Sequence, residues 1–202
     1  MITVHHLKRS RSKRVIWLLE ELSVPYNVVT HQRDPISHLA PRSLQAIHPL
    51  GKAPMMVDGD ITICESGAIL EYILNNAGAN QLRPAINTTQ YYRYLEWSHF
   101  AEGSLSLPVI SSLLLQIEPN EGSSPLTRYI AKEIDVDFTY INKYLENQPY
   151  FAGESFTAAD IMMTIMLEIA VSLKLINDKN NIKNYLINIQ KRDAYLIAAK
   201  HG

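Results

Sequence analysis

An acid and a hydroxyl stand side by side at Glu65 and Ser66, where the pattern of the chain changes. The stretch ITIC before them is rich in β-branched residues and favours a strand, whereas SGAILEYIL after them has helical spacing. The first N–H groups of a helix have no partners within the helix, and the helix dipole favours negative charge at that end. The pair therefore predicts a binding site for an anion such as a carboxylate. The simpler alternative is a helix cap beside an exposed acid.

A second candidate site lies upstream, in the stretch Lys52-Ala53-Pro54 that precedes the strand-like run MMVD. Proline has no N–H and cannot donate to a sheet ladder. If the Ala53–Pro54 bond is cis, the backbone of Ala53 turns outward and can pair with an extended peptide, as in strand addition. The alternative is an ordinary loop proline beside a solvated lysine. Together with Glu65 and Ser66, this stretch indicates a groove of peptide size.

The first 76 residues are predicted to form the strands and helices that position these candidate residues. The runs ITVHHL and YNVVT favour strands, and the segment between them, SKRVIWLLEEL, carries a helical apolar stripe at positions 15, 18, 19 and 22. MMVD and ITIC flank Gly59 as a hairpin, and a helix from Ser66 follows. The order is β-α-β-α-β-β-α. Because a helix joins the first two strands, they should be parallel, and the last two antiparallel.

The chain beyond these strands and helices is helical in pattern throughout. The segment 77–87, with Gly, Pro and Asn and no clear period, is the expected linker. Residues 88–202 should form an all-helical domain, whose first long helix bends near Gly103 or Pro108. Thr157 and Asp160 match a capping box, so we assign them to folding.

Composition excludes several classes of protein. The 202 residues have 47% hydrophobic content and a net charge of −1, and neither half is basic enough for nucleic-acid binding. A single cysteine, Cys64, excludes an internal disulfide and fits a reducing compartment. His5 and His6 point to opposite faces of a strand, so no metal site is expected. No apolar signal core or run of ~20 apolar residues is present, which predicts a cytoplasmic protein without a membrane span.

Four segments in order, SRSKRVIWLLEELSVPY, HPLGKAPMMVDG, ESGAILEYI and AGESFTAADIMM, resemble the glutathione transferase family over nearly the whole chain. Within the family, the start of the chain is most similar to the branch typified by a yeast microsomal-type enzyme and its bacterial relatives. The resemblance implies an α/β N-terminal thioredoxin-like domain plus an all-α C-terminal helical domain. It also implies glutathione as cosubstrate, a homodimer and a cis Ala53–Pro54 bond.

The resemblance gives each candidate residue a role toward glutathione. Ser66 would hold the α-carboxylate of the γ-glutamyl group, and Glu65 would complement the nearby ammonium. Ala53 and Pro54 would align the peptide backbone of the ligand. Lys52 would pair with the glycine carboxylate as a point charge.

The stretch KRSRSKRV offers two serines for thiol activation, Ser10 and Ser12. A thiol attacks only as the thiolate, and a hydroxyl that donates to the sulfur near a helix N-terminus favours that form. Ser12 suits the helix cap. Ser10 is nearer the strand end, where the family places its activating hydroxyl. We therefore predict Ser10 as the catalytic donor, with Ser12 as the alternative. The surrounding basic residues would help to hold the anion or would form a solvated helix start.

The leading hypothesis is a transferase that conjugates glutathione to small apolar electrophiles in detoxification. The electrophile would be held against the helix around Tyr94–Leu107. Glutathione-dependent peroxidase or disulfide reductase activity would use the same groove and is a second hypothesis. A third is a non-catalytic interaction protein, because a fold does not fix a function.

Overall fold

The structure is a computed structural model, and it describes residues 1–77, 82–117 and 124–201. It divides into two compact units, one of residues 1–82 with 190–202 and one of residues 83–189. The expected linker 77–87 includes positions that lie outside the described residues. The sequence placed the last helix in the domain 88–202, whereas the structure groups that helix with the first unit.

The first unit contains a mixed four-stranded sheet in the order β2-β1-β3-β4. Its elements are β1 (Ile2–Leu7), α1 (Ser12–Glu21), β2 (Tyr26–His31), the short 3₁₀ helix η1 (Arg42–Leu44), β3 (Met55–Asp58), β4 (Ile61–Cys64), α2 (Ser66–Asn76) and α8 (Asp193–Ala199). β1 and β2 are parallel, whereas β1–β3 and β3–β4 are antiparallel, as the sequence predicted. This is the thioredoxin-like arrangement that the resemblance implied.

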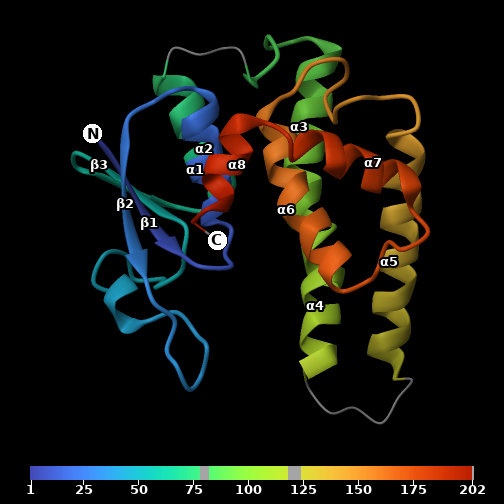
Figure 1. Cartoon of the computed structure of the whole chain (residues 1–202), viewed down its shortest axis with the longest axis horizontal. Helices are drawn as coiled ribbons and strands as arrows, with labels where there is room; N and C mark the ends of the chain where they lie inside the picture. The colour runs from blue at the N-terminus through green and yellow to red at the C-terminus, as the bar shows by residue number, and fades with distance from the viewer. Residues whose placement is uncertain (78–81, 118–123, 202) are drawn as a thin grey trace. The chain divides into compact units, whose positions relative to one another are not determined.

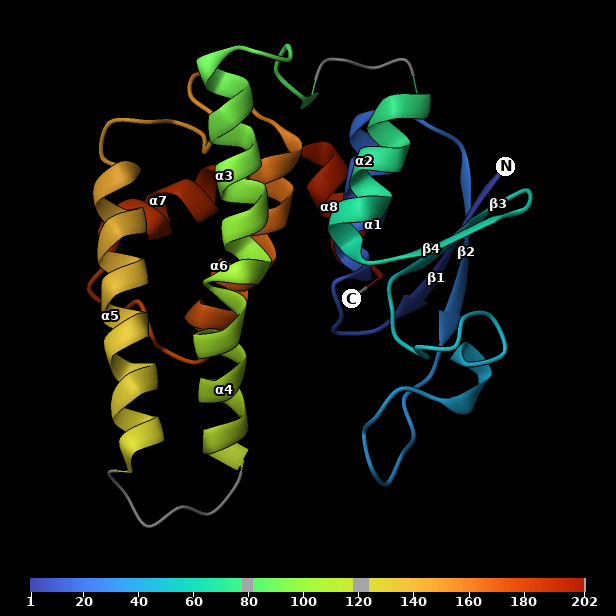
Figure 2. The same cartoon turned by 180° about the vertical axis from the view of Figure 1, so that it is seen from behind.

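Helix α1 is more deeply buried than its apolar stripe predicted. Positions 15 to 19 are all buried, and not only one face of the helix. α1 packs against β1, α2 and α8, so it has neighbours on several sides. Figures 1 and 2 both show the red helix α8 beside the blue helix α1. The Trp17 and Tyr195 rings meet edge to face, 5.1 Å apart, which fixes α8 on α1.

The second unit is helical: α3 (Thr89–Gly103), α4 (Ser106–Ile117), α5 (Pro125–Tyr144), α6 (Ala158–Ser172) and α7 (Asn180–Ile189). Where the sequence predicted a bend near Gly103 or Pro108, the helix ends at Gly103 and α4 begins at Ser106. α6 is the central helix, and its residues 158 to 167 are all buried. Thr157 and Asp160 form the predicted capping box, in which the Thr157 N–H donates to Asp160 Oδ2 at 2.8 Å.

Among the described residues, the stretch Thr89–Ile117 has the length and apolar composition of a membrane-crossing helix. Its apolar residues do not form an unbroken run, so the sequence predicted no membrane span there. Core helices of water-soluble proteins have the same properties. In this stretch α3 packs against α6, with Tyr94 and Trp97 buried.

Candidate functional site

The turn between β1 and α1 brings Ser10 and Ser12 together. Their Oγ atoms are 2.6 Å apart, and the Ser12 N–H donates to Ser10 Oγ at 3.2 Å. Ser12 was expected to cap α1, but it is the first residue of the helix and is fully buried. Ser10 instead accepts from the helix start and is only half-buried. Of the two hydroxyls, Ser10 is therefore the one with surface open to a ligand.

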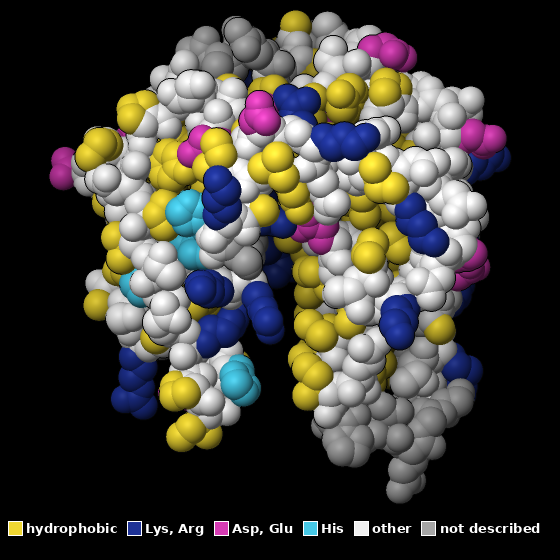
Figure 3. All heavy atoms as spheres, viewed as in Figure 1, with side chains coloured by type: hydrophobic (Ala, Val, Ile, Leu, Met, Phe, Trp, Pro, Cys, Tyr) yellow, Lys and Arg dark blue, Asp and Glu magenta, His cyan; other side chains and the backbone are white. Residues whose placement is uncertain are grey.

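The backbone just before Ser10 is held by Arg33, which extends from the segment after β2. The Arg33 guanidinium donates to the carbonyls of Lys8 and Arg9 at 3.2 and 3.1 Å. Arg9 has a positive φ of 55°, a conformation that side chains other than glycine seldom adopt. On the first unit, Figure 3 shows dark blue Lys and Arg and cyan His side chains gathered on one face. A positive surface of this kind attracts anions.

The Ala53–Pro54 peptide bond is cis, as the resemblance implied. Pro54 is buried, Ala53 is half-buried and Lys52 is exposed. Gly51 sets up this turn: its φ is +57°, and a Cβ on it would lie 2.6 Å from Gln45 Cγ. Only glycine fits that position without a shift of its neighbour.

Glu65 and Ser66 lie at the start of α2, where the acid and not the serine takes the cap position. Glu65 is the N-cap, with φ 74° and ψ 114°, and Ser66 is the first helical residue. Strained backbone at a non-glycine residue concentrates at functional sites. Ser66 is only 3% exposed, and its Oγ accepts a hydrogen bond from Arg14 Nη1 at 3.0 Å. The helix start is therefore joined to a buried cation.

Comparisons with known proteins show the family of the chain. The family described as "Glutathione S-transferase, N-terminal domain" matches residues 1–75, and "Glutathione S-transferase, C-terminal domain" matches residues 107–192. Glutathione S-transferase 3 of Schizosaccharomyces pombe is 34% identical, over 99% of this chain and 87% of its own length. The chain belongs to the glutathione S-transferase family.

Solved structures related to this transferase have the same fold. A glutathione S-transferase from Actinobacillus pleuropneumoniae is 32% identical with a TM-score of 0.90, covering 99% of this chain and 92% of that one. The transferase URE2P8 of Phanerochaete chrysosporium, solved with oxidized glutathione, has a TM-score of 0.82 at 20% identity. It covers 98% of this chain and 93% of that one, and at this identity the likeness concerns the fold alone. A glutathione transferase family member from Pseudomonas fluorescens, with a TM-score of 0.82 at 22% identity over 98% of this chain and 91% of that one, was solved with two glutathione bound.

Two residues near the site were not singled out from the sequence. Arg14 was counted in the basic run at the helix start, yet it is fully buried. Its position gives the signal, since it lies four residues before the core residue Leu18 and shares its helix face. For His6 the sequence suggests only a metal-ligand role, which its place on the strand argues against. It is 1% exposed, and its Nδ1 lies 2.8 Å from Ser12 Oγ.

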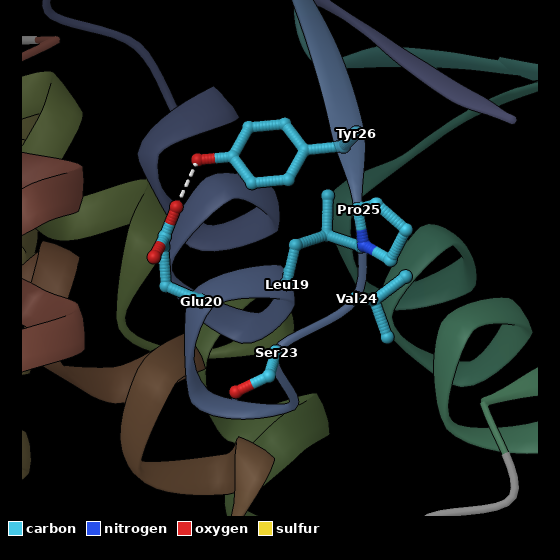
Figure 4. Close-up of a pocket in the computed structure, with 6 residues that line it drawn as sticks. All are labelled: Leu19, Glu20, Ser23, Val24, Pro25 and Tyr26. Atoms are coloured by element: carbon cyan, nitrogen blue, oxygen red, sulfur yellow. Dashed lines mark hydrogen bonds between the residues drawn. The ribbon is translucent and has the colours of Figure 1, made fainter.

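A separate surface depression of about 580 Å³ lies at the other end of α1. Figure 4 shows its lining and the hydrogen bond from the Tyr26 hydroxyl to Glu20; the lining residues are Leu19, Glu20, Ser23, Val24, Pro25 and Tyr26. Burial raises the pKa of Tyr26, so its hydroxyl stays protonated. This depression is remote from Ser10, because α1 separates the two. Among the described residues, no group of three or more His, Cys, Asp or Glu could hold a metal ion.

Proposed function

We propose that this transferase binds glutathione along Ala53–Pro54 and conjugates its thiolate to small apolar electrophiles. The observation that carries the proposal is the joint placement of a half-buried Ser10, a cis Ala53–Pro54 bond and the Glu65–Ser66 helix start in one unit. Each feature alone has a structural explanation. Together they offer one ligand a backbone edge, an anion site and a hydroxyl.

The carboxylate end of the γ-glutamyl group would bind at the N-terminus of α2. The first N–H groups of that helix and its dipole favour an anion. Arg14 adds a buried positive charge next to Ser66 Oγ. Glu65 would complement the ammonium, and the exposed Lys52 would meet the glycine carboxylate at the other end.

In the reaction, the Ser10 hydroxyl would donate to the sulfur and favour the thiolate over the thiol. The serine stabilises the nucleophile and does not attack. Much of the rate would come from holding the thiolate next to the electrophile. We further propose that the transferase works in the cytoplasm as a homodimer in detoxification, outside the membrane and without nucleic acid or a metal.

The test is retention on immobilised glutathione, followed by conjugation to a generic aromatic halide. Ser10→Ala should depress turnover and leave the affinity for glutathione unchanged. A loss with Ser12→Ala while Ser10→Ala keeps its turnover would move the activating role to Ser12. Peroxide reduction without conjugation would replace the proposed reaction with a glutathione-dependent peroxidase.

A non-catalytic role is the second candidate, and one relative favours it. A protein named probable elongation factor 1-gamma 1 from Arabidopsis thaliana is 24% identical over 83% of this chain and 40% of its own length. A thermal shift with glutathione separates the two roles, since a ligand that binds only the native state must raise Tm. No shift would favour the interaction role.

A further inference from the structure

A chain of polar groups runs from Ser10 into the core of the first unit. Ser10 Oγ lies 2.6 Å from Ser12 Oγ, and Ser12 Oγ lies 2.8 Å from His6 Nδ1. On the far side of the ring, His6 Nε2 lies 2.6 Å from the carbonyl oxygen of His201, which follows α8. The chain thus begins at the half-buried hydroxyl and ends on a fixed acceptor.

The contact between His6 Nε2 and the His201 carbonyl determines the directions of these hydrogen bonds. A carbonyl oxygen can only accept, so His6 Nε2 carries a hydrogen. Burial lowers the pKa of His6, so the ring is neutral at physiological pH and Nδ1 must accept. The Ser12 hydroxyl then donates to Nδ1. Because Ser12 has one hydroxyl hydrogen, the short contact between the serines uses the hydrogen of Ser10.

This direction presents the wrong group to a thiolate. With its own hydrogen turned inward, Ser10 Oγ offers a lone pair outward, and a lone pair accepts from a thiol instead of stabilising an anion. The longer contact from Ser12 Oγ to the Leu7 carbonyl, at 3.3 Å, is a weaker alternative for the Ser12 hydrogen. Without glutathione, the hydrogen-bond chain from Ser10 to His6 is therefore arranged to take up a proton.

We propose that His6 receives the thiol proton of glutathione through Ser10 and Ser12, and so turns Ser10 into a donor. The S–H bond breaks as the proton passes to Ser10 Oγ, the hydrogen of Ser10 passes to Ser12 Oγ, and the hydrogen of Ser12 passes to His6 Nδ1. The products are a thiolate and an imidazolium, and the hydrogen on Ser10 now points at the sulfur. This inference rests on the proposed role of Ser10. His6 acts through the serines and does not touch the substrate, so it is a positioning residue.

The charged ring would be fully hydrogen-bonded. Its Nε2–H would still donate to the His201 carbonyl, and its new Nδ1–H would donate to Ser12 Oγ. Lys8, His31 and His201 all disfavour positive charge on His6, as does burial. The hydrogen bond to the His201 carbonyl favours the charged ring, and the anionic sulfur at the other end of the hydrogen-bond chain would add to that effect. His6 should therefore be charged when the thiolate is bound and neutral without it.

The direct experiment follows the His6 ring by NMR in the free transferase, with glutathione and with S-methylglutathione. At neutral pH, glutathione should convert the His6 ring nitrogens from the neutral to the protonated pattern. S-methylglutathione has no thiol proton, so it should bind and leave the ring neutral. This readout uses the unaltered chain and needs no turnover.

Variants give the second readout, the pKa of the bound thiol from the ultraviolet absorbance of the thiolate. His6→Asn keeps an acceptor near the Nδ1 position but cannot hold the proton. The pKa of the bound thiol should therefore rise by about one unit, and at any pH below that pKa roughly tenfold less thiolate should form. Ser12→Ala should do the same because it interrupts the chain. His5→Asn changes the neighbouring histidine, whose Nδ1 contacts His31 Nε2 at 3.1 Å instead of the serines, and should leave the thiol pKa unchanged.

Failures of the two proposals can be told apart. If glutathione does not bind, or Ser10→Ala leaves the bound thiol pKa unchanged, the proposed function fails and the relay fails with it. If Ser10→Ala raises the thiol pKa but the His6 ring stays neutral with glutathione bound, the relay alone is wrong. A His6→Asn variant with the thiol pKa of the parent would also overturn the relay.

Discussion

Arg14 donates a hydrogen bond from Nη1 to the Oγ of Ser66, 3.0 Å away, and both side chains are buried. The two residues are 52 positions apart in the chain, at the starts of α1 and α2. A charge without access to water is stabilised only by its hydrogen-bond partners or by an anion. The pair therefore couples the packing of the two helices to the proposed carboxylate site.

Arg14→Met should weaken glutathione binding roughly tenfold, about the effect of one charge-assisted hydrogen bond. It should also lower the free energy of unfolding by about 1–3 kcal/mol, because buried Ser66 Oγ loses its donor. Calorimetric titration and denaturant unfolding measure the two effects. Arg9→Met, an exposed residue of the same basic run, is the control and should change neither quantity by as much. Equal effects in the two variants would assign the binding loss to overall charge.

Gly51→Ala should destabilise the transferase more than Gly59→Ala. Both glycines have positive φ, at +57° and +58°, so each alanine carries a backbone penalty of about 1 kcal/mol. A Cβ at Gly59 meets nothing within 4 Å, whereas one at Gly51 meets Gln45 Cγ at 2.6 Å. Adding Gln45→Ala to Gly51→Ala should remove the difference in the free energy of unfolding. A double variant as unstable as Gly51→Ala would show that the clash is elsewhere.

Asp137 and Asp160 are both buried, and desolvation raises the pKa of each to about 6, but replacing them with Asn should have opposite effects. Asp137 Oδ2 finds no hydrogen-bond partner among the described residues, so its ionised form is poorly stabilised. Asp137→Asn should therefore raise the free energy of unfolding at pH 7 by about 1–2 kcal/mol. Asp160 accepts from the Phe151 N–H, the Thr157 N–H and the Tyr185 hydroxyl, so Asp160→Asn should lower it.

The pH dependence of the same two carboxyls has a definite sign. Each folded-state pKa is raised above the ordinary value of 3.8, so the unfolded state releases its proton first. The contribution of each group to stability is full below about pH 4 and is lost as the pH rises through about 6. Urea midpoints from pH 4 to pH 7 should fall less steeply in Asp137→Asn. An unchanged slope would mean that Asp137 titrates normally.

Arg192→Ala should loosen α8. The Arg192 guanidinium donates two hydrogen bonds to Glu21 at the end of α1, from Nε to Oε1 at 2.6 Å and from Nη2 to Oε2 at 2.7 Å. Glu21 is also held by the Trp17 Nε1–H at 2.9 Å. The loss should amount to about 1–3 kcal/mol, because the pair is bidentate and partly buried. Faster amide exchange confined to α8 is the expected observation. Uniformly faster exchange would mean global and not local destabilisation.

Local sequence patterns were sufficient to predict most of the strands and helices and their order. Strand and helix order, the parallel first pair and the capping box at Thr157 follow from periodicity and chain connection, which are properties of short segments. The cis Ala53–Pro54 bond came from the family resemblance, since sequence alone cannot choose the isomer.

Roles that depend on contacts between distant segments were not predictable in this way. Ser12 and Ser66 have the residue type of helix caps, yet each is buried one position inside its helix because other side chains supply its partners. The burial of Arg14 depends on Ser66, and that of His6 on the segment after α8. A charged run or a histidine pair in the sequence does not say which member turns toward the interior.

The packing of α8 on α1 has a consequence for biosynthesis. The ribosome produces α8 only after the whole helical unit, so the Trp17 ring lacks its contact with Tyr195 throughout most of translation. The thioredoxin-like half cannot complete its interior as an early, autonomous module. A nascent chain stalled before Asp193 should recruit chaperones through that indole, although every strand of the sheet has already emerged.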